Sequence, residues 1–578
     1  MTLDRFFPFL VWGRRYGRDD LQGDLIAGVI VTLMLIPQSL AYAMLANLPP
    51  EVGLYASTVP LLAYAVFGSS RTLAVGPVAV VSLMTAAAIG QVAAPGTAEA
   101  AGAALLLAAL SGLFLLALGL LRLGFLANLL SHPVVSGFIS ASAIMIAVSQ
   151  IKHVLGVAGG GGAVYEQVYS LVLELPTLNP VTAVIGLVAL AWLFWVRRGL
   201  APLLRRWLGW SGRLVDVIVR AAPVVAVALS TLVVYAFSLA ERAGVAVVGS
   251  FPAGLPPLTL PPLDAPLAVD LLPAAVLIAI VGFVESVSVA QALAAKRREH
   301  IEPNQELIGL GAANLAAGFT GGYPVTGGFA RSGVNFAAGA RTPLAGVLTA
   351  VLIGVVALVA TPLFRDLPNA VLAATIIVAV LSLVDLGKIA EVFRYSTADG
   401  LAMAATIVGV LALGIELGIV IGIALSLAIH VYRTSRPHIA VVGRVPGTEH
   451  YRNVERHKVL TDPRVLAVRV DESLYFPNAR YLEERVMALV ARNPKVERVV
   501  LICSAVNLID ASAIESLEAL IHHLRDAGVA FDLAEVKGPV MDRLERSHIF
   551  PLLEGRIHLS THAAMMAGER PAGTTAAA

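Results

Sequence analysis

The chain has 578 residues, of which 57% are hydrophobic and only 14% charged, and its mean hydropathy is +0.81. This composition excludes an ordinary soluble enzyme and indicates a protein with many membrane-spanning segments in a lipid bilayer. The net charge of +2 gives no reason to expect nucleic acid as a partner, and the single cysteine excludes an internal disulfide or a cysteine-rich metal site, so we expect no cofactor and no metal.

Apolar runs divide most of the chain into about fourteen segments, which predicts a polytopic α-helical membrane protein. They cover approximately residues 25–45, 52–67, 75–93, 101–121, 133–154, 180–196, 214–239, 273–295, 307–320, 324–338, 343–364, 370–386, 398–414 and 417–431. Several are shorter than the roughly 20 residues of a full span, so we expect some to be half-helices buried within protein. No small-residue cleavage site follows the first arginines, so we expect no removable signal peptide.

Basic residues indicate how these segments are oriented. If the N-terminus is cytoplasmic, the basic groups at 197–213, 296–298, 388–394 and 433–436 all fall on the cytoplasmic side. The opposite loops carry mainly Arg242 and Arg365. This asymmetry follows the positive-inside rule, so we expect a multi-pass protein of the inner (cytoplasmic) membrane with both termini in the cytoplasm.

The first apolar segment contains Pro37, followed by Gln38 and, one turn later, Tyr42. A proline within a helix removes a backbone hydrogen bond, so we expect a break here whose freed groups need partners. Gln38 is therefore either a ligand-binding residue or only the partner of that break. Tyr42, taken alone, is either a ligand or a packing residue.

Two glycine- and proline-rich stretches lead into short apolar segments, at 69–77 and at 318–324. Their corresponding places in two halves of the chain predict an inverted-repeat transporter whose site lies between the repeats. Two half-helices would direct their positive ends at one place, which favours an anion. Glu285 and Arg331 are ionisable residues in the same region, where charge at membrane depth usually marks a substrate path. A structural ion pair between the two is the alternative.

After residue 436 the pattern changes to alternating strands and helices. Strands are predicted at 465–470, 496–503 and 529–534, and helices at 479–492, 511–527 and 540–547. This alternation predicts a small α/β domain at 437–566, in the cytoplasm, after a transmembrane domain at 1–436. The alanine- and threonine-rich tail at 567–578 is predicted to be disordered.

Several motifs together carry a family resemblance. They are PQSLAYAMLA at 37–46, GLYAS at 53–57, YAVFGSSR at 64–71, VGP at 75–77, NQELIGLGAAN at 304–314 and PVTGGFARSGVN at 324–335. Across nearly the whole chain the sequence resembles the sulfate permease (SulP) family of anion transporters. LIDASAIESL at 508–517 and VKGPVMDRL at 536–544 resemble the STAS domain, which anti-sigma-factor antagonists share.

The resemblance implies a 7+7 inverted-repeat fold of fourteen segments with two half-helices, divided into a core and a gate and usually dimeric. It implies an anion site between the starts of the third and tenth segments. By matching motif positions, the substrate-binding residues would be Gln38, Tyr42, Val78, Ala330 and Arg331, with Glu285 at the coupling-ion site. Ala330 replaces a serine that is common in the family. Val289, four residues after Glu285, lacks the hydroxyl of sodium-coupled members, so we expect proton rather than sodium coupling.

In the STAS-like domain, antagonists carry a phosphorylated serine directly after the motif aspartate, where this chain has Ala511. The resemblance therefore does not imply that phosphorylation switch at this position, and Ser504 and Ser512 stay as alternative sites for one. Ser512 and Glu515 have the spacing of a capping box, which predicts a helix start there. Binding of a cytoplasmic partner by this domain stays one of the alternatives.

These observations predict a transporter rather than an enzyme. The expected function is secondary active transport of sulfate or a related small anion, by proton symport, in a homodimer. Bicarbonate and C4-dicarboxylates are alternative substrates, and a passive anion channel is an alternative mechanism. A membrane sensor that signals through the STAS-like domain is the alternative of another class.

Overall fold

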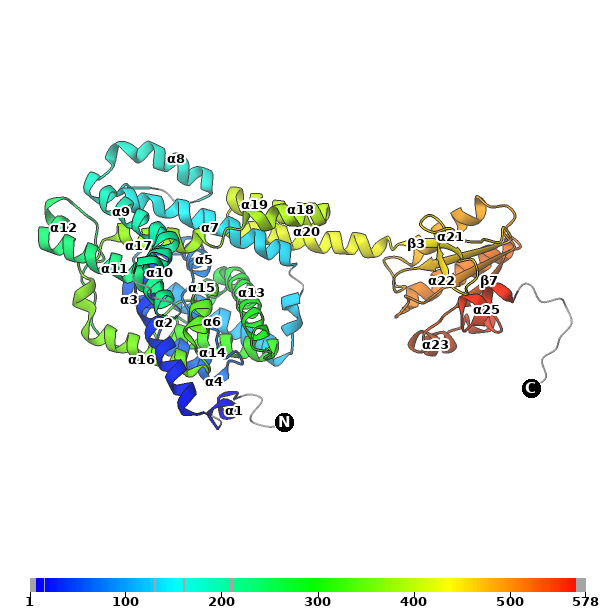
Figure 1. The fold of residues 1–578 in the computed structure, drawn as a ribbon, viewed down its shortest axis with the longest axis horizontal. Coiled ribbons are helices and arrows are strands. Elements are labelled where there is room, and N and C mark those ends of the chain that lie inside the picture. The colour runs from blue at the N-terminus through cyan, green and yellow to red at the C-terminus, as the bar shows by residue number, and fades with distance from the viewer. Residues whose placement is uncertain (1–6, 15, 129–130, 160–161, 208–212, 568–578) are drawn as a thin grey trace. The chain divides into compact units, whose positions relative to one another are not determined.

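A computed structural model describes residues 7–14, 16–128, 131–159, 162–207 and 213–567. The chain divides into two compact units, Met1–Ser426 and Leu427–Ala578 (Figure 1). The domain limits at residues 436 and 437 remain predictions. The tail predicted to be disordered lies outside the described residues, apart from Ala567.

The first unit is helical (Figure 1). Together with α20, which begins in this unit and ends at Ser435, its helices form two sets of seven segments. The first set comprises α2 (Arg18–Leu45), α3 (Pro50–Tyr55) with α4 (Val59–Phe67), α5 (Ala79–Gly90), α6 (Ala98–Leu120), α7 (His132–Leu155), α9 (Pro180–Trp195) and α11 (Arg213–Phe237). The second comprises α13 (Ala265–Ala295), α14 (Pro303–Phe319), α15 (Phe329–Ala338), α16 (Leu344–Val359), α17 (Asn369–Leu381), α19 (Thr397–Leu413) and α20 (Ile415–Ser435).

Shorter elements join these segments. They are α1 (Phe9–Gly13), η2 (Gly124–Asn128), α8 (Val164–Glu174), η3 (Leu175–Thr177), η4 (Val196–Leu200), α10 (Ala201–Trp207), α12 (Leu239–Arg242), η5 (Thr361–Phe364) and α18 (Leu386–Tyr395). The helices α8 and α18 correspond to none of the predicted apolar segments, because each is amphipathic rather than apolar on all sides.

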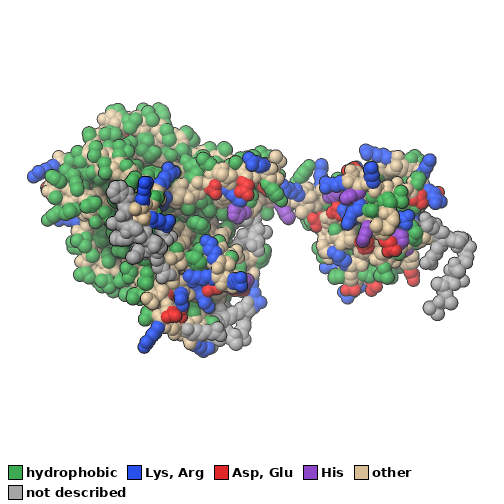
Figure 2. Space-filling view, viewed as in Figure 1, with side chains coloured by type: hydrophobic (Ala, Val, Ile, Leu, Met, Phe, Trp, Pro, Cys, Tyr) green, Lys and Arg blue, Asp and Glu red, His purple; other side chains and the backbone are tan. Residues whose placement is uncertain are grey.

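The described residues include seven helices that are long and apolar enough to cross a membrane, by length and composition. Many apolar side chains on this unit are exposed, among them Leu113, Val188, Leu232 and Val359. Figure 2 shows hydrophobic side chains covering most of the visible face of the unit. Exposed apolar area of this extent needs a non-aqueous surrounding, which a bilayer supplies.

The two sets are related by an inverted repeat, and their packing shows it. The first helix of one set contacts the third and fourth helices of the other: α2 packs against α15 and α16, and α13 packs against α5 and α6. Likewise α4 packs against α16, and α14 against α6. Each contact therefore has its counterpart after exchange of the two repeats. The predicted 7+7 architecture is confirmed.

The break predicted at Pro37 is wrong, because α2 runs without interruption from Arg18 to Leu45 with Pro37 inside it. The proline ring removes only one helical hydrogen bond, and surrounding helices offset that loss. Here α15, α16 and α17 all pack against α2.

The second unit is an α/β domain with a six-stranded sheet in the order β4-β3-β5-β6-β7-β8. Its strands are β3 (Ile439–Arg444), β4 (Tyr451–Asn453), β5 (Val465–Val470), β6 (Arg498–Ile502), β7 (Ala530–Ala534) and β8 (Ile557–His558). Its helices are α21 (Ala479–Ala491), α22 (Ala511–Asp526), α23 (Gly538–Glu545), α24 (Phe550–Leu553) and α25 (Thr561–Met566). The strands β5 to β8 run parallel, and β3 pairs antiparallel with both β4 and β5.

The predicted elements of this unit appear as β5, β6, β7, α21, α22 and α23. The elements β4, β8, α24 and α25 were not predicted because each has only two to six residues, and β3, which lies between β4 and β5, was also missed. The helix start is also corrected. The N-cap of α22 is Asp510, which accepts a hydrogen bond from the Ala513 amide at 2.8 Å, so Ser512 and Glu515 do not form a capping box.

Candidate functional site

The two half-helices begin side by side because the segments before them pair as strands. β1 (Val75–Gly76) precedes α5, and β2 (Thr326–Gly327) precedes α15. The strands pair antiparallel, with Val75 opposite Gly327 and Gly76 opposite Thr326. The pair joins corresponding points of the two repeats, so both helix starts are fixed by one backbone contact.

Neither half-helix has a side-chain cap at its start. Val78 is the N-cap of α5 and Gly328 that of α15, and both have extended backbones. The first amide groups of a helix have no partner within the helix. Together with the helix dipole, such uncapped amides favour an anion.

Arg331 lies in the first turn of α15 but reaches across to the segment before α5. Its side chain is only 4% exposed. Nε donates to the Ala74 carbonyl at 3.2 Å, and Nη1 donates to the Pro77 carbonyl at 3.1 Å. Nη2 is buried without a hydrogen-bond partner among the described residues. The guanidinium thus crosses between the half-helices with one nitrogen still able to bind a ligand.

Two glycines allow the backbone to approach this guanidinium closely. A Cβ on Gly76 would lie 3.2 Å from both Nη atoms of Arg331, and Gly76 has φ +147°. A Cβ on Gly328 would lie 3.4 Å from Nη2 and 3.3 Å from Cγ2 of Val78. The close approach places Val78 next to Arg331, as the motif positions predicted.

Tyr42 lies in α2 and Glu285 in α13, and both helices pack against α15, which bears Arg331. Tyr42 is buried and Glu285 part-buried. Among the described residues, no ion pair within 4.0 Å joins Glu285 to Arg331. The described residues therefore do not include the structural ion pair between Glu285 and Arg331 that was the alternative.

Gln38 and Ala330 line a cavity of about 200 Å³ between α2, α15 and the helices α9, α11 and α17. Ala330 is exposed in it, while Gln38 is part-buried. Arg331 does not line this cavity; its guanidinium lies behind the start of α15. The six predicted residues thus lie in one region of the fold. Some of them line the cavity, and the others lie behind its wall.

The segment before α5 is held by helices of the other repeat. The Glu306 carboxylate on α14 accepts hydrogen bonds from Tyr64 Oη at 2.8 Å, from Ser69 Oγ at 2.6 Å, and from the amides of Ser69 and Ser70, both at 2.8 Å. Further along, Ser332 Oγ accepts from the Ala74 amide at 2.9 Å. The four donors satisfy the buried carboxylate and fix the turn that leads into β1.

The segment before α15 is held in a similar way. Asn314 forms two hydrogen bonds of 2.9 Å with the backbone of Val325, one to its amide and one to its carbonyl. Ser286 Oγ accepts from the Gly327 amide at 2.9 Å and lies 2.7 Å from the Thr326 hydroxyl. Helices α13 and α14 thereby position β2.

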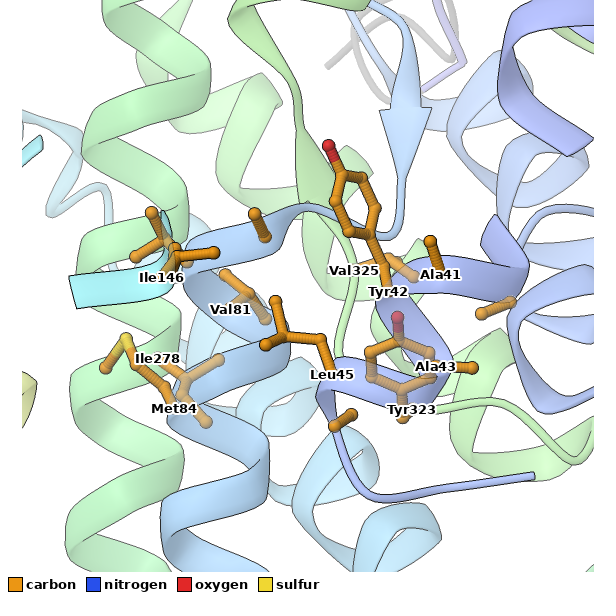
Figure 3. Close-up of a cluster of buried hydrophobic side chains, with 14 of the residues drawn as sticks. Ala41, Tyr42, Ala43, Leu45, Val81, Met84, Ile146, Ile278, Tyr323 and Val325 are labelled. Carbon is orange, nitrogen blue, oxygen red and sulfur yellow. The ribbon is translucent and has the colours of Figure 1, made fainter. Parts of the chain in front are cut away.

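Apolar packing supports the other side of the half-helices. Figure 3 shows Tyr42 and Leu45 projecting from α2, with Val81 and Met84 of α5 near Ile278 of α13. All five residues belong to the same buried core. The N-terminal amides of α5 therefore belong to a firmly packed helix rather than to a loop.

Sequence reasoning assigned no role to Glu306, Asn314, Ser286 and Ser332. Glu306 and Asn314 lie within the 304–314 motif, and their spacing on one polar stripe of an apolar helix was the available signal. Ser286, next to Glu285, gave no such signal. The described residues contain no group of three or more His, Cys, Asp or Glu side chains that could hold a metal ion.

Comparison with known proteins agrees with this arrangement. The profile of the sulfate permease family matches residues 21–406, and that of the STAS domain matches residues 457–564. Sulfate transporter 4.1, chloroplastic, of Arabidopsis thaliana is 37% identical over 567 residues, which cover 95% of this chain and 80% of that protein. A Mycobacterium tuberculosis protein named "Probable sulfate transporter" is 34% identical over 565 residues, covering 96% and 98%.

Two solved structures share the fold. The murine Solute Carrier 26 family member A9 anion transporter, in its inward-facing state, has a TM-score of 0.89 at 23% identity and covers 98% of this chain and 94% of that one. The transmembrane domain of the cyanobacterial bicarbonate transporter BicA has a TM-score of 0.59 at 25% identity, covering 71% and 98%. These relatives are transporters, not enzymes. With its profile match and its long, similar relatives, the chain belongs to the sulfate permease family and carries a C-terminal STAS domain.

Proposed function

We propose that the chain carries out secondary active transport of sulfate or a related small anion, coupled to protons. The observation that carries this proposal is the pair of uncapped half-helix starts with Arg331 buried between them. The names of the similar plant and mycobacterial proteins support sulfate as the substrate.

Magnitudes indicate how the anion is held. Each helix end contributes about 0.3–1 kcal/mol, and up to about 2 kcal/mol when partly buried. Removing all water from an ion costs on the order of tens of kcal/mol. The helix ends alone do not offset that cost, so the charge of Arg331 and some remaining hydration are also needed. We therefore expect an anion that keeps part of its water, next to Gln38 and Ala330.

Glu285 is the proposed proton carrier. It is a part-buried carboxylate near Arg331, without an ion-pair partner within 4.0 Å among the described residues. The position four residues on is Val289, which is buried and offers no oxygen to a sodium ion. Binding of a proton would change the charge next to the anion and so couple the two.

The remaining proposals concern placement and assembly. We place the protein in the inner membrane with both termini in the cytoplasm, on the distribution of basic residues. We propose a homodimer, a STAS domain at 437–566 that contacts a cytoplasmic partner, and a transport domain that ends at residue 436.

Uptake into proteoliposomes tests the function. Radiolabelled sulfate, bicarbonate and a C4-dicarboxylate are compared under imposed proton and sodium gradients. Concentrative sulfate uptake that follows the proton gradient is the expected result. A current that reverses at the anion's Nernst potential without coupling would identify a channel, and absence of flux with anion-dependent binding of a partner would identify a sensor.

Glu285→Gln tests the coupling, because the amide keeps the shape of the side chain but cannot take up a proton. We expect concentrative uptake driven by a pH gradient to be abolished, while counterflow of sulfate across equal pH persists. Glu416→Gln, a substitution of another glutamate of the transmembrane unit, is the matched control and should keep pH-driven uptake. Accumulation that persists in Glu285→Gln would place the proton site elsewhere.

A further inference from the structure

The cavity beside the candidate site extends along α2 and α15, the two helices that carry Gln38 and Ala330. In α2 its wall extends from Gln38 to Met34, and in α15 from Ala330 to Val334. These residues lie one helical turn apart in each helix. The cavity therefore leads from the start of α15 toward the end of that helix.

That direction is also toward the beginning of α2. The residue after α15, Gly339, packs so closely on Gly23 that a Cβ on Gly23 would meet the Gly339 carbonyl oxygen. Gly23 lies in the second turn of α2. The cavity thus extends toward the membrane face at which α2 begins.

Arg197 lies on the opposite wall of this cavity, in the π-helical segment η4 that follows α9. It is the only charged side chain among the described residues that line the cavity; the others are apolar apart from Gln38 and Thr375. A π-helical turn is rare and often marks a functional position, because it changes the direction in which one side chain points.

Arg197 has no ion-pair partner among the described residues, because no carboxylate of theirs lies within 4.0 Å of its guanidinium. Arg197 lines the same cavity as Gln38 and Ala330, so its charge faces the space beside the half-helix starts. Apolar walls concentrate the field of such a charge within a cavity.

We infer that Arg197 forms an outer binding site for the transported anion, at the α2-start side of the cavity, from which the anion passes to the half-helix starts. The inference rests on the proposed anion transport. The guanidinium suits a small oxyanion, because its planar donors bind two oxygens at once. This site differs from that of Arg331, which is buried and comes from another helix.

Substitutions at position 197 test the inference, with Arg198 as the matched control. Arg198 is the next residue of η4, is also exposed, and does not line the cavity. Sulfate transport is measured in vesicles that expose the α2-start face to added sulfate, at low and high ionic strength. We expect Arg197→Gln to raise KM about five-fold at low ionic strength, the effect of one charge on a divalent anion several ångströms away in water.

The pattern across variants identifies the cause. Arg197→Lys keeps the charge but loses the planar donors of the guanidinium, so its KM should lie between those of wild type and Arg197→Gln. The KM of Arg197→Glu should exceed that of Arg197→Gln, and Arg198→Gln should change KM little. The differences should shrink at high ionic strength, because salt screens the attraction. Equal KM values for Arg197→Gln and Arg198→Gln would overturn the inference.

A titration of sulfate into the purified full-length protein separates this inference from the proposed function. If the wild-type protein transports no sulfate, the proposed function is wrong, and the titration alone then tests the inference about Arg197. A weaker dissociation constant for Arg197→Gln than for Arg198→Gln then supports the outer site, and identical constants reject it.

Discussion

At the scale of single residues, the central feature is a buried cation whose hydrogen bonds are incomplete. Arg331 donates to two carbonyl oxygens of the opposite repeat but leaves Nη2 without a partner among the described residues. A buried donor without a partner is costly, and more so when the group is charged. An anion at the half-helix starts would remove that cost.

Arg331→Ala should therefore weaken sulfate binding about 10- to 100-fold, as expected for loss of a hydrogen bond to a charged group. Arg365→Ala removes an exposed arginine outside the site and should leave the affinity unchanged. Binding is measured by titration on protein that elutes as a folded assembly. Unchanged affinity in Arg331→Ala would contradict the assignment.

Cys503 provides a residue-scale test of the STAS domain. The thiol is 4% exposed, and burial, with a smaller effect of Glu535, raises its pKa to about 12 from an ordinary value of 9.0. Because the thiol is the favoured form in the folded state, this contribution to stability is complete below pH 9.0 and is lost as pH rises toward 12.

We therefore expect Cys503 to resist thiol reagents at pH 8 in the native protein and to react at once in denaturant. The chain has one cysteine, so the labelling kinetics report on this site alone. Fast labelling of the native protein at pH 8 would show that the β6 end is open rather than buried.

At the scale of elements, the extended segment before α15 is positioned by α13 and α14, and neither helix contributes a described residue to the cavity wall. Ser286 offers the cleanest test. Ser286→Ala leaves the Gly327 amide without its partner, so we expect a loss of about 1–3 kcal/mol in stability and a weaker affinity for sulfate.

Ser288→Ala is the matched control two residues along α13. Its hydroxyl bonds only to the Val284 carbonyl of its own helix, so its removal should change little. Thermal unfolding in detergent and sulfate titration are compared for both variants. Equal effects of the two substitutions would show that β2 does not depend on Ser286.

The sequence predicted the repeat architecture because hydropathy and glycine-proline stretches are local signals. Val78 and Ala330 were named only through the resemblance to the sulfate permease family, whose motifs flank the two half-helices. The sequence could not predict that Arg331 reaches the Pro77 carbonyl, nor that Glu306 holds the turn at Ser69, since both contacts join residues far apart in the chain. Arg197 was visible only as one of several basic residues at a membrane face, because a π-helical turn has no clear sequence pattern.

At the scale of the whole molecule, the chain separates transport from the STAS domain. The half-helices, Arg331 and the cavity all belong to the first unit, and the second unit has its own sheet and core. Truncation after Arg436 keeps α20 complete. We therefore expect the truncated protein to bind sulfate within about two-fold of the full-length protein, below the factor that one lost hydrogen bond produces.

The comparison is made in liposomes, corrected for the folded fraction of each protein. Lower expression, dimer stability or turnover is compatible with this division, because none of these quantities measures the affinity of the anion site. A well-folded truncation that no longer binds sulfate would show that the STAS domain belongs to the site.

The pairing of β1 with β2 also has a consequence for biosynthesis. The carbonyl of Pro77 receives its hydrogen bond from Arg331, a residue 254 positions later in the chain. A ribosome therefore delivers the first repeat to the membrane long before the partners of Val75 and Pro77 exist. Until the second repeat arrives, those backbone groups lack their final partners, so the first repeat alone is an incomplete folding intermediate. Two separately expressed halves should consequently regain anion binding only when both are present in the same membrane.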